Sequence, residues 1–184
     1  MKLLVVVDMQ TDFVDGALGT EEAVAIVPAV CSKIRTFDGE IITTMDTHHK
    51  NYLATQEGNQ LPVIHCVYGK NGWKFNEDVR DALLARNDVW INNFQKETFG
   101  SVALAEYIQD MIAKVVVIDE IVLIGLCTDI CVISNALLLK AFLPEIQITV
   151  DAKCCAGVTP ESHENALKAM KMCQINIENW EGSK

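Results

Sequence analysis

A carboxylate directly follows the first apolar run of the chain. Residues 3–7 are all apolar, and Asp8 comes next, ahead of Gln10, Asp12 and Phe13. An acid that closes a buried strand is well placed either for acid–base catalysis or to cap the following turn. A phosphotransferase of the haloacid dehalogenase type would need a second Asp two residues later, but Gln10 stands there and cannot exchange a proton. The sequence therefore disfavours that magnesium-dependent chemistry.

Two thiols lie near the start of a predicted helix. Residues 125–132 read Gly-Leu-Cys-Thr-Asp-Ile-Cys-Val, a strand end followed by a helix that Thr128 or Asp129 could cap. Cys131 would lie in the first helical turn, where free N–H groups stabilise a thiolate and can bind an oxyanion. Cys127 precedes the helix and is the weaker nucleophile. Both thiols could instead be structural, and no second ligand pair follows for a zinc site built on cysteines.

Imidazoles and carboxylates gather after another predicted strand. Asp46 and His48 stand two residues apart at its end, and His65 lies at or beyond the end of a neighbouring strand. Three such ligands can meet at one zinc, iron or manganese ion, or they can be unrelated polar loop residues. A fourth ligand must come from residues 49–64, where Glu57 is preferred because its loop can fold back over the site. The other candidates are His49, Gln56, Asn59 and Gln60.

Alternating strands and helices must position these groups. Short β-branched runs predict strands at residues 3–7, 40–45, 63–67, 120–126, 145–151 and 174–178, and an extended segment at 89–92. Apolar residues at helical spacing predict helices at 21–37, with Thr20 as its cap, and at 76–86, 102–114, 130–142 and 160–173. This order predicts an α/β fold with three layers: a doubly wound, mainly parallel β-sheet with helices on both faces. Ligands of such folds bind at the carboxyl ends of the strands, where Asp8, Asp46 and the segment after Leu126 stand.

Length and composition narrow the class of protein. The 184 residues, of which 50% are hydrophobic and 22% charged, predict a single folded domain over residues 1–184. The net charge of −10 disfavours nucleic acids and anionic membranes as partners. No apolar run approaches the roughly 20 residues that span a bilayer, and Asp8 ends the first run too early for a signal peptide. The seven cysteines, an odd number, indicate reduced thiols, so we expect a cytoplasmic protein.

In their order and spacing, three motifs resemble those of the isochorismatase-like cysteine hydrolase superfamily, and within it the bacterial nicotinamidases (pyrazinamidases). The motifs are the strand end Asp8-Met9-Gln10-Thr11-Asp12-Phe13, the lone Lys96, which would not be singled out by itself, and residues 125–132. The resemblance extends to Asp151-Ala152 and Gly157. It implies a catalytic triad of Asp8, Lys96 and Cys131. It also implies a cis peptide between Leu126 and Cys127, and an oxyanion hole made by the backbone N–H groups of Cys127 and Cys131.

Nicotinamidases hold a metal ion beside the triad, and a matching ligand set is present. Asp46-Thr47-His48 and His65-Cys66 fit the family pattern, and Glu57 stands where some bacterial members use a Glu. The His that many members place shortly after the first is missing. No Trp precedes His65, so Phe13, Phe99 or Trp73 is expected to line the substrate pocket. The resemblance implies one divalent metal ion, with zinc as the first choice and manganese or iron as alternatives.

The activity that the resemblance implies is hydrolysis of nicotinamide to nicotinate and ammonia. It would run through a cysteine thioester, with the metal orienting the pyridine ring. The missing His and Trp leave open another small-amide or N-carbamoyl hydrolase of the superfamily, whereas the intact triad argues against a member that binds without catalysis. The expected partner is a small-molecule amide, and we expect a homo-oligomer.

Overall fold

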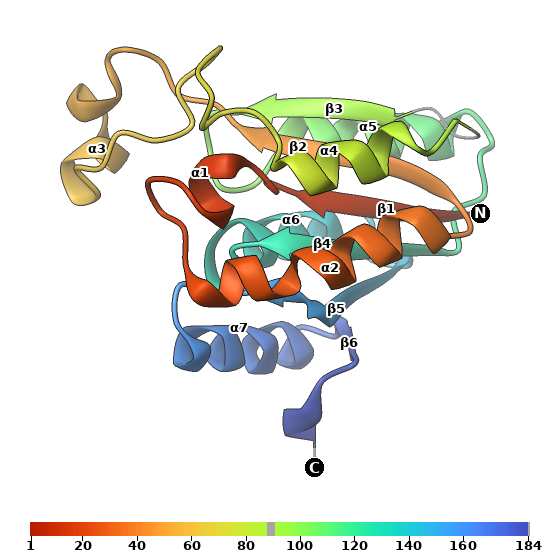
Figure 1. Cartoon of the computed structure of the whole chain (residues 1–184). Coiled ribbons are helices and arrows are strands. Elements are labelled where there is room, and N and C mark those ends of the chain that lie inside the picture. Colours follow the sequence, from red (N-terminus) through yellow and green to blue (C-terminus); the bar gives the residue numbers. More distant parts are fainter. Residues whose placement is uncertain (88–90, 184) are drawn as a thin grey trace.

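The computed structural model describes residues 1–87 and 91–183, and its centre is one parallel sheet (Figure 1). Six strands in this part of the chain lie in the order β3-β2-β1-β4-β5-β6, and every neighbouring pair runs parallel. The strands are β1 (Lys2–Val7), β2 (Glu40–Asp46), β3 (Ile91–Lys96), β4 (Glu120–Leu126), β5 (Gln147–Ala156) and β6 (Asn176–Glu178). This is the doubly wound arrangement that the sequence predicts, with every pairing parallel.

The central strands are apolar on both faces because helices cover both. In β1, Leu3, Val5 and Val7 pack into one hydrophobic cluster. Leu4 and Val6 point the opposite way and pack into a second cluster. Side chains of a strand alternate between its faces, so an uninterrupted apolar run is what a strand in the middle layer requires.

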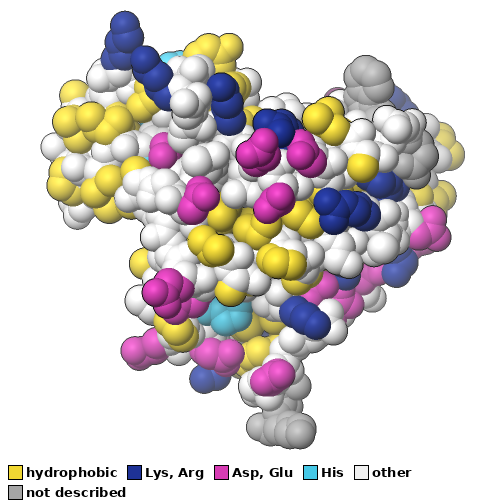
Figure 2. Space-filling model, viewed as in Figure 1, with side chains coloured by type: hydrophobic (Ala, Val, Ile, Leu, Met, Phe, Trp, Pro, Cys, Tyr) yellow, Lys and Arg dark blue, Asp and Glu magenta, His cyan; other side chains and the backbone are white. Residues whose placement is uncertain are grey.

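One face of the sheet is covered by α2 (Glu21–Thr36) and α4 (Glu77–Leu84) (Figure 1). The predicted cap of α2 is confirmed, since Thr20 Oγ1 accepts a hydrogen bond of 3.0 Å from the N–H of Ala23. Asn76 caps α4 in the same way through the N–H of Asp78. Figure 2 shows that acidic and basic side chains are interspersed on this side of the molecule.

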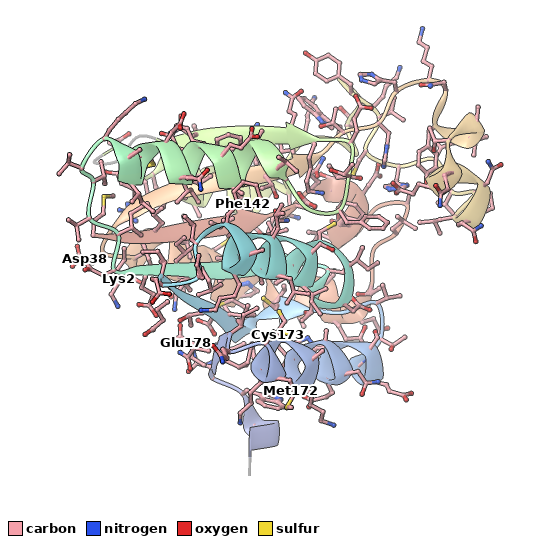
Figure 3. The ribbon with its side chains drawn as sticks, turned by 180° about the vertical axis from the view of Figure 1, so that it is seen from behind. Lys2, Asp38, Phe142, Met172, Cys173 and Glu178 are labelled. Carbon is pink, nitrogen blue, oxygen red and sulfur yellow. The ribbon has the colours of Figure 1, made fainter. Side chains whose placement is uncertain are left out.

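The opposite face is covered by α5 (Val102–Ala113), α6 (Ile133–Phe142) and α7 (Pro160–Met172), as Figure 3 shows from behind. Their buried residues join the cluster that contains Leu3, Val5 and Val7. Two helical layers around the sheet give the predicted three layers. None of the helices in the described residues has the length and apolar character needed to cross a membrane.

Between β2 and β3 the chain leaves the sheet. Residues 49–64, which we call the arm, contain the short helices η1 (Tyr52–Ala54) and α3 (Gln56–Gln60) and extend beyond the carboxyl edge of the sheet (Figure 1). The predicted strand at 63–67 is wrong: residues 63–66 form a loop, and only Val67 makes an isolated bridge, to His48. Val63 and Ile64 are 36% and 57% exposed, so this apolar run is not enclosed by two helical layers.

The remaining elements agree with the prediction within a few residues, with three qualifications. The strand predicted at 145–151 spans Gln147–Ala156 as β5, so it ends five residues later than predicted. The predicted extended segment at 89–92 lies partly outside the described residues; Ile91 and Asn92 open β3. The predicted helix at 130–142 begins earlier, with a wide π-type turn at Thr128–Val132 that continues into α6. The short helix α1 (Thr11–Val14), absent from the prediction, follows β1.

Candidate active site

The strand order changes direction between β1 and β4, and the candidate residues lie at the carboxyl end of that junction. Asp8 follows β1, the turn that carries Cys131 follows β4, and Lys96 ends β3. In doubly wound sheets this switch point is where ligands bind. Gly125 in β4 adopts φ +116°, and a Cβ there would lie 2.1 Å from the carbonyl oxygen of Val7. A glycine at this position therefore lets β1 and β4 approach where they deliver the two groups.

The three residues of the predicted triad come together around the ammonium group of Lys96. Lys96 Nζ lies 2.6 Å from Oδ2 of Asp8 and donates a hydrogen bond to Sγ of Cys131 at 3.5 Å. Lys96 is buried, so its charge acts in a medium where water screens it little. The neighbouring anionic groups outweigh burial and hold the pKa of Lys96 above its usual range. The lysine therefore stays positively charged beside the acid and the thiol.

Asp8 is held in a strained and fully enclosed position. Its φ of 47° lies in the left-handed region, and its side chain has no exposed surface. Thr44 Oγ1 donates a hydrogen bond of 2.6 Å to Oδ1, so the two oxygens of the carboxylate have different partners. Burial raises the pKa of Asp8 above its ordinary value, against the opposing effects of Lys96 and Thr44. A carboxylate with a raised pKa is a better proton acceptor.

Cys131 lies in the wide turn before α6, within the first helical turn as the sequence predicts. Burial and the nearby Asp8 raise the pKa of its thiol well above the ordinary value, and Lys96 only partly opposes them. The resting thiol is therefore protonated and needs a base. Asn135, buried one turn later, donates from Nδ2 to the carbonyl oxygens of Cys131 at 2.8 Å and Phe99 at 3.2 Å. This amide fixes the turn against the loop that follows β3.

The predicted capping roles of Thr128 and Asp129 are wrong. The residue at the cap position is Cys127, and its side chain makes no capping bond. Thr128 Oγ1 instead lies 2.8 Å from Nδ1 of His163 in α7, and the Asp129 carboxylate accepts from the N–H of Val158. Both polar side chains thus anchor the turn to α7 and to the segment that leads into it.

Cys127 occupies the position expected of a backbone contributor. The peptide bond between Leu126 and Cys127 is cis, which confirms the implication of the resemblance. Burial and nearby carboxylates, Asp129 first among them, raise the pKa of the Cys127 thiol to about 12. This thiol is therefore a poor nucleophile at neutral pH. The assignment of an oxyanion hole to the N–H groups of Cys127 and Cys131 stays a prediction.

A second group of polar side chains lies next to the triad. Asp46, His48, Glu57 and His65 each offer one ligand atom, and these atoms all lie within 4.8 Å of one another. From Nε2 of His48, Oδ2 of Asp46 is 2.9 Å away and Oε1 of Glu57 is 3.4 Å away. From Nε2 of His65, the same two oxygens are 3.5 and 3.8 Å away. Ligand atoms bound to one tetrahedral zinc lie roughly 3.4 Å apart, so the spacing fits such an ion.

The surroundings of the two imidazoles also fit a metal. Nε2 of His48 is buried and has no hydrogen-bond partner of acceptable geometry among the described residues, although Asp46 Oδ2 is close. Nδ1 of His65 lies 2.8 Å from the carbonyl oxygen of Val63; donation there leaves Nε2 free to act as a ligand. Such a donor set suits zinc, manganese or iron. His49 does not join the group, since it is exposed and pairs with Glu97 at 3.3 Å.

Asp46, His48, Glu57 and His65 are called the metal-binding group below. Asp46 links this group to the triad. Its Oδ1 lies 3.6 Å from Lys96 Nζ, while Oδ2 faces the imidazoles. Burial works against its charge, but the neighbouring imidazoles of His48 and His65 and the charge of Lys96 outweigh burial and hold the pKa of Asp46 below its usual range. Asp46 therefore carries the negative charge that a divalent cation requires.

Gln10 and Asp12, in the motif after β1, hold the backbone at and next to residues of the metal-binding group. The side chain of Gln10 accepts from the N–H of Asp46 and donates to its carbonyl oxygen, each at 2.8 Å. Gln10 also donates to the carbonyl oxygen of Trp73 at 2.8 Å. Asp12 accepts from the N–H of Cys66 at 2.8 Å, next to His65. Sequence reasoning named Gln10 only for the proton it cannot exchange and missed this role.

Further residues in the site were not predicted. Tyr52 packs its ring against His48 and His65, with ring centroids 4.4 and 5.0 Å apart, and donates its hydroxyl to Leu61. It therefore ties the arm to two of the metal-binding residues. Thr44 and Asn135 were also missed. A hydroxyl or amide inside a run of buried residues was the available signal, because buried polar groups need partners.

A cavity of about 210 Å³ joins the two groups. Cys127 and Cys131 line it, as do Asp46, Glu57 and His65. The predicted substrate-binding residues Phe13 and Phe99 also line it, and Phe13 lies 5.5 Å from the ring of His65. Trp73 does not; its Nε1 donates to Thr47 instead. The cavity thus offers two thiols, apolar walls and three of the possible metal ligands to one small ligand.

Comparison with known proteins agrees with this arrangement. The family model described as the isochorismatase domain matches residues 2–181. A pyrazinamidase of Pyrococcus horikoshii, solved in complex with zinc, is 28% identical over 97% of this chain and 99% of that one, with a TM-score of 0.78. A nicotinamidase/pyrazinamidase of Bacillus subtilis is 25% identical over 96% and 98%, with a TM-score of 0.78. A pyrazinamidase/nicotinamidase of Streptococcus mutans, 24% identical over 96% and 99%, has the same fold at a TM-score of 0.81. No curated protein sequence matches significantly.

Proposed function

This chain belongs to the isochorismatase family of hydrolases, and we propose that it is a metal-containing amidohydrolase that converts nicotinamide to nicotinate and ammonia. The observation that carries the proposal is the position of Lys96, whose Nζ is 2.6 Å from Asp8, 3.5 Å from Cys131 and 3.6 Å from Asp46. One ammonium group thus adjoins an acid, a thiol and a metal-binding group at the cavity of about 210 Å³. Two of the solved structures similar to the chain bear nicotinamidase and pyrazinamidase names at 25% and 28% identity.

The first half of the reaction forms a thioester. Asp8 takes the proton of the Cys131 thiol, and the sulfur attacks the carboxamide carbon. The carbonyl electron pair moves to oxygen, where the N–H groups of Cys127 and Cys131 receive the negative charge; losing one such donor costs about 3 kcal/mol of barrier. The tetrahedral centre then collapses, the C–N bond breaks, and Asp8 returns its proton to the leaving nitrogen, which departs as ammonia.

The second half hydrolyses the thioester. A water molecule gives one proton to Asp8 and attacks the thioester carbon as the C–O bond forms. Collapse of the second tetrahedral centre breaks the C–S bond, and the sulfur regains the proton from Asp8. The product leaves as nicotinic acid, which loses its remaining proton to solvent and becomes nicotinate. Lys96 stays positively charged throughout and stabilises the ionised forms of Asp8 and Cys131. Asp46, His48, Glu57 and His65 would hold the metal, which when bound supplies a Lewis acid for the ring nitrogen of the substrate.

Ammonia release from a panel of amides tests this proposal. Nicotinamide and pyrazinamide should be hydrolysed, and benzamide poorly, because it has the same shape without a ring nitrogen. A chelator should slow nicotinamide turnover, and added zinc or manganese should restore it. Equal rates on all three amides would refute the ring-nitrogen contact. Turnover of N-carbamoyl compounds alone would favour the alternative within the superfamily, and no turnover of any amide would favour a binding protein. Cytoplasmic location and homo-oligomeric assembly stay predictions.

A further inference from the structure

We propose that the groove between the arm and the loop after β3 is a subsite for an uncharged, hydrogen-bonding substituent on the ring of the substrate. This inference rests on the proposed amidohydrolase function and adds a substrate class to it: heteroaromatic carboxamides whose ring carries a polar extension. The groove has a volume of about 690 Å³ and lies beside the cavity that contains Cys131.

The groove and the inner cavity adjoin each other. Glu57, Leu61, Phe99 and Ile130 line both of them. The inner cavity alone, at about 210 Å³, is smaller than the roughly 300–1,000 Å³ of typical small-molecule sites. A single ring carboxamide can occupy the inner cavity, and a larger ligand can continue between the four shared side chains into the groove.

The groove joins the cavity on the side away from the nucleophile. Cys127 and Cys131 line only the inner cavity, whereas His48 and Tyr52 line only the groove. With the carboxamide carbon at Cys131 and the ring nitrogen toward His48 and Glu57, the groove meets a ring carbon remote from the carboxamide. A substituent on the leaving nitrogen would instead lie near Asp8 and Cys131 and gain nothing from the groove.

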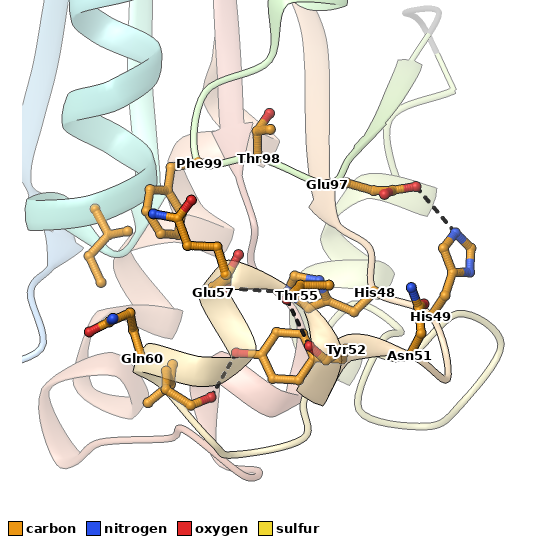
Figure 4. A pocket seen from close by; sticks show the side chains of 13 residues that line it. His48, His49, Asn51, Tyr52, Thr55, Glu57, Gln60, Glu97, Thr98 and Phe99 are labelled. Carbon is orange, nitrogen blue, oxygen red and sulfur yellow. Dashed lines mark hydrogen bonds and ion pairs between the residues drawn. The ribbon is translucent and has the colours of Figure 1, made fainter.

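The side chains of the groove indicate the chemistry of the extension. Asn51, Gln56 and Gln60 line it, and their side chains make no hydrogen bond within the described part of the chain (Figure 4). Their amides are therefore available to a ligand as donors and acceptors. Two carboxylates line it, Glu57 and Glu97, and its described lining residues include no Lys or Arg. Hydroxyl or amide extensions suit these three amides, whereas a carboxylate or phosphate would find no Lys or Arg to pair with among the described lining residues.

The arm presents these amides on a defined surface. Gln56, Glu57 and Gln60 lie on the face of α3 that lines the groove, while Asn59 lies off that face. Gly58 is buried against η1, where a Cβ would lie 2.1 Å from the carbonyl oxygen of Tyr52. Thr55 caps α3 through the N–H of Gly58 at 3.0 Å. Close packing and the cap therefore hold α3 so that the face carrying Gln60 lines the groove.

A matched pair of substrates and a matched pair of variants test the proposal. The substrates are nicotinamide and a nicotinamide with a hydroxyethyl group on a ring carbon remote from the carboxamide. The zinc-loaded enzyme should hydrolyse both, with kcat/KM values within about tenfold of each other. Gln60→Trp fills the groove and should lower the ratio of extended to plain substrate by at least about tenfold. Asn59→Trp, on the same helix but outside the groove, should leave the ratio unchanged.

Each outcome bears on one claim. If nicotinamide is hydrolysed and the extended amide is more than about 100-fold poorer, the subsite is refuted and the amidohydrolase function stands. A Gln60→Trp variant that lowers both activities equally also refutes it, as does a preference for hydroxyethyl on the carboxamide nitrogen. Turnover of the extended amide alone would support the subsite and refute plain nicotinamide as the substrate. If neither amide is hydrolysed, the subsite and the proposed function both fail.

Discussion

Thr44 and Asp8 are joined by a hydrogen bond of 2.6 Å between the threonine hydroxyl and Oδ1 of the carboxylate. The other oxygen of Asp8 faces Lys96, also at 2.6 Å. Neutral and charged partners are thus divided between the two oxygens of one fully buried acid. Because a bond to the ionised form lowers a pKa, Thr44 holds Asp8 at a lower pKa than burial alone would give.

Replacing Thr44 by valine should therefore move the pH profile. The expected change in Thr44→Val is a rise in the pKa of Asp8, so the acid limb of kcat/KM shifts to higher pH. A hydrogen bond to a charged group contributes about 1.5–3 kcal/mol, which corresponds to roughly one to two pH units. Thr44→Ser keeps the hydroxyl and should keep the wild-type profile. A Thr44→Val profile identical to that of the wild type would show that this hydroxyl does not tune the base.

The two cysteines of the cavity should respond differently to substitution. Cys131→Ala should lower nicotinamide turnover by at least about 10³-fold, because no thioester can form. Cys127→Ala should largely preserve turnover, since only the backbone of Cys127 is expected to take part. Ammonia release measures both variants, and near-normal activity in Cys131→Ala would end the thioester mechanism.

Glu57 is the ligand that comes from the arm, and Glu57→Ala should weaken the metal site. We expect lower metal content and a higher KM for nicotinamide, with Cys131 still reactive toward alkylating agents. Metal analysis of the purified variant provides the measurement, and Glu97→Ala, which removes a carboxylate outside the group, is the control. Full metal occupancy with unchanged KM would remove Glu57 from the site.

Gln10 holds Asp46 through both ends of its amide, so Gln10→Glu should weaken metal binding without touching a ligand. A carboxylate in that position would face the carbonyl oxygens of Asp46 and Trp73 without a donor. Loss of such a supporting contact lowers metal affinity about 10- to 100-fold. Titration of the metal-free protein measures this, with Gln109→Glu, at an exposed position of α5, as a control for the added charge. Equal affinities in the two variants would contradict the positioning role.

His163 should make the fold less stable in mild acid. Burial lowers the pKa of His163 below its ordinary value, although Glu164 and Asp129 oppose this. The unfolded chain therefore binds the proton more readily than the folded one, and the contribution is fully present above a pH of about 6.5 and lost as pH falls below it. Denaturation of wild type and His163→Gln between about pH 7 and 5 should show a shallower loss in the variant. Parallel slopes would exclude His163 as the cause.

The layers and most strands could be predicted because a strand that is buried on both faces has an uninterrupted run of apolar residues. The strand β4 spans Glu120–Leu126, the residues that the sequence predicts, and six of its seven residues form one uncharged run. The loop at residues 63–66 could not be recognised, because Val63 and Ile64 have the composition of a strand and only their exposure distinguishes them. Lys96 needed the family resemblance, since nothing in its neighbours along the chain shows that β3 delivers it to a buried site.

The supporting contacts of the site were beyond sequence reasoning for a different reason. Gln10 and Asp46 are 36 positions apart, as are Thr44 and Asp8. Asp8, Asp46 and His48 can be recognised in the sequence as titratable groups at strand ends. An amide or hydroxyl within an apolar run indicates only that the group needs a partner, and not which distant residue that partner is. The titratable groups of the site can therefore be predicted from the sequence more readily than the amides and hydroxyls that position them.

The triple contact of Lys96 limits how this active site can change. Because one ammonium group adjoins Asp8, Cys131 and Asp46, substitutions on the catalytic side and on the metal side share a partner, and their effects should not add. A related protein that lost the metal through replacement of Asp46 would leave Lys96 with one anionic neighbour fewer. The same substitution would change the pKa values of the Cys131 thiol and of Asp8. Evolutionary change in this pocket is therefore epistatic: a substitution that alters metal binding through Asp46 also alters the reactivity of the Cys131 thiol.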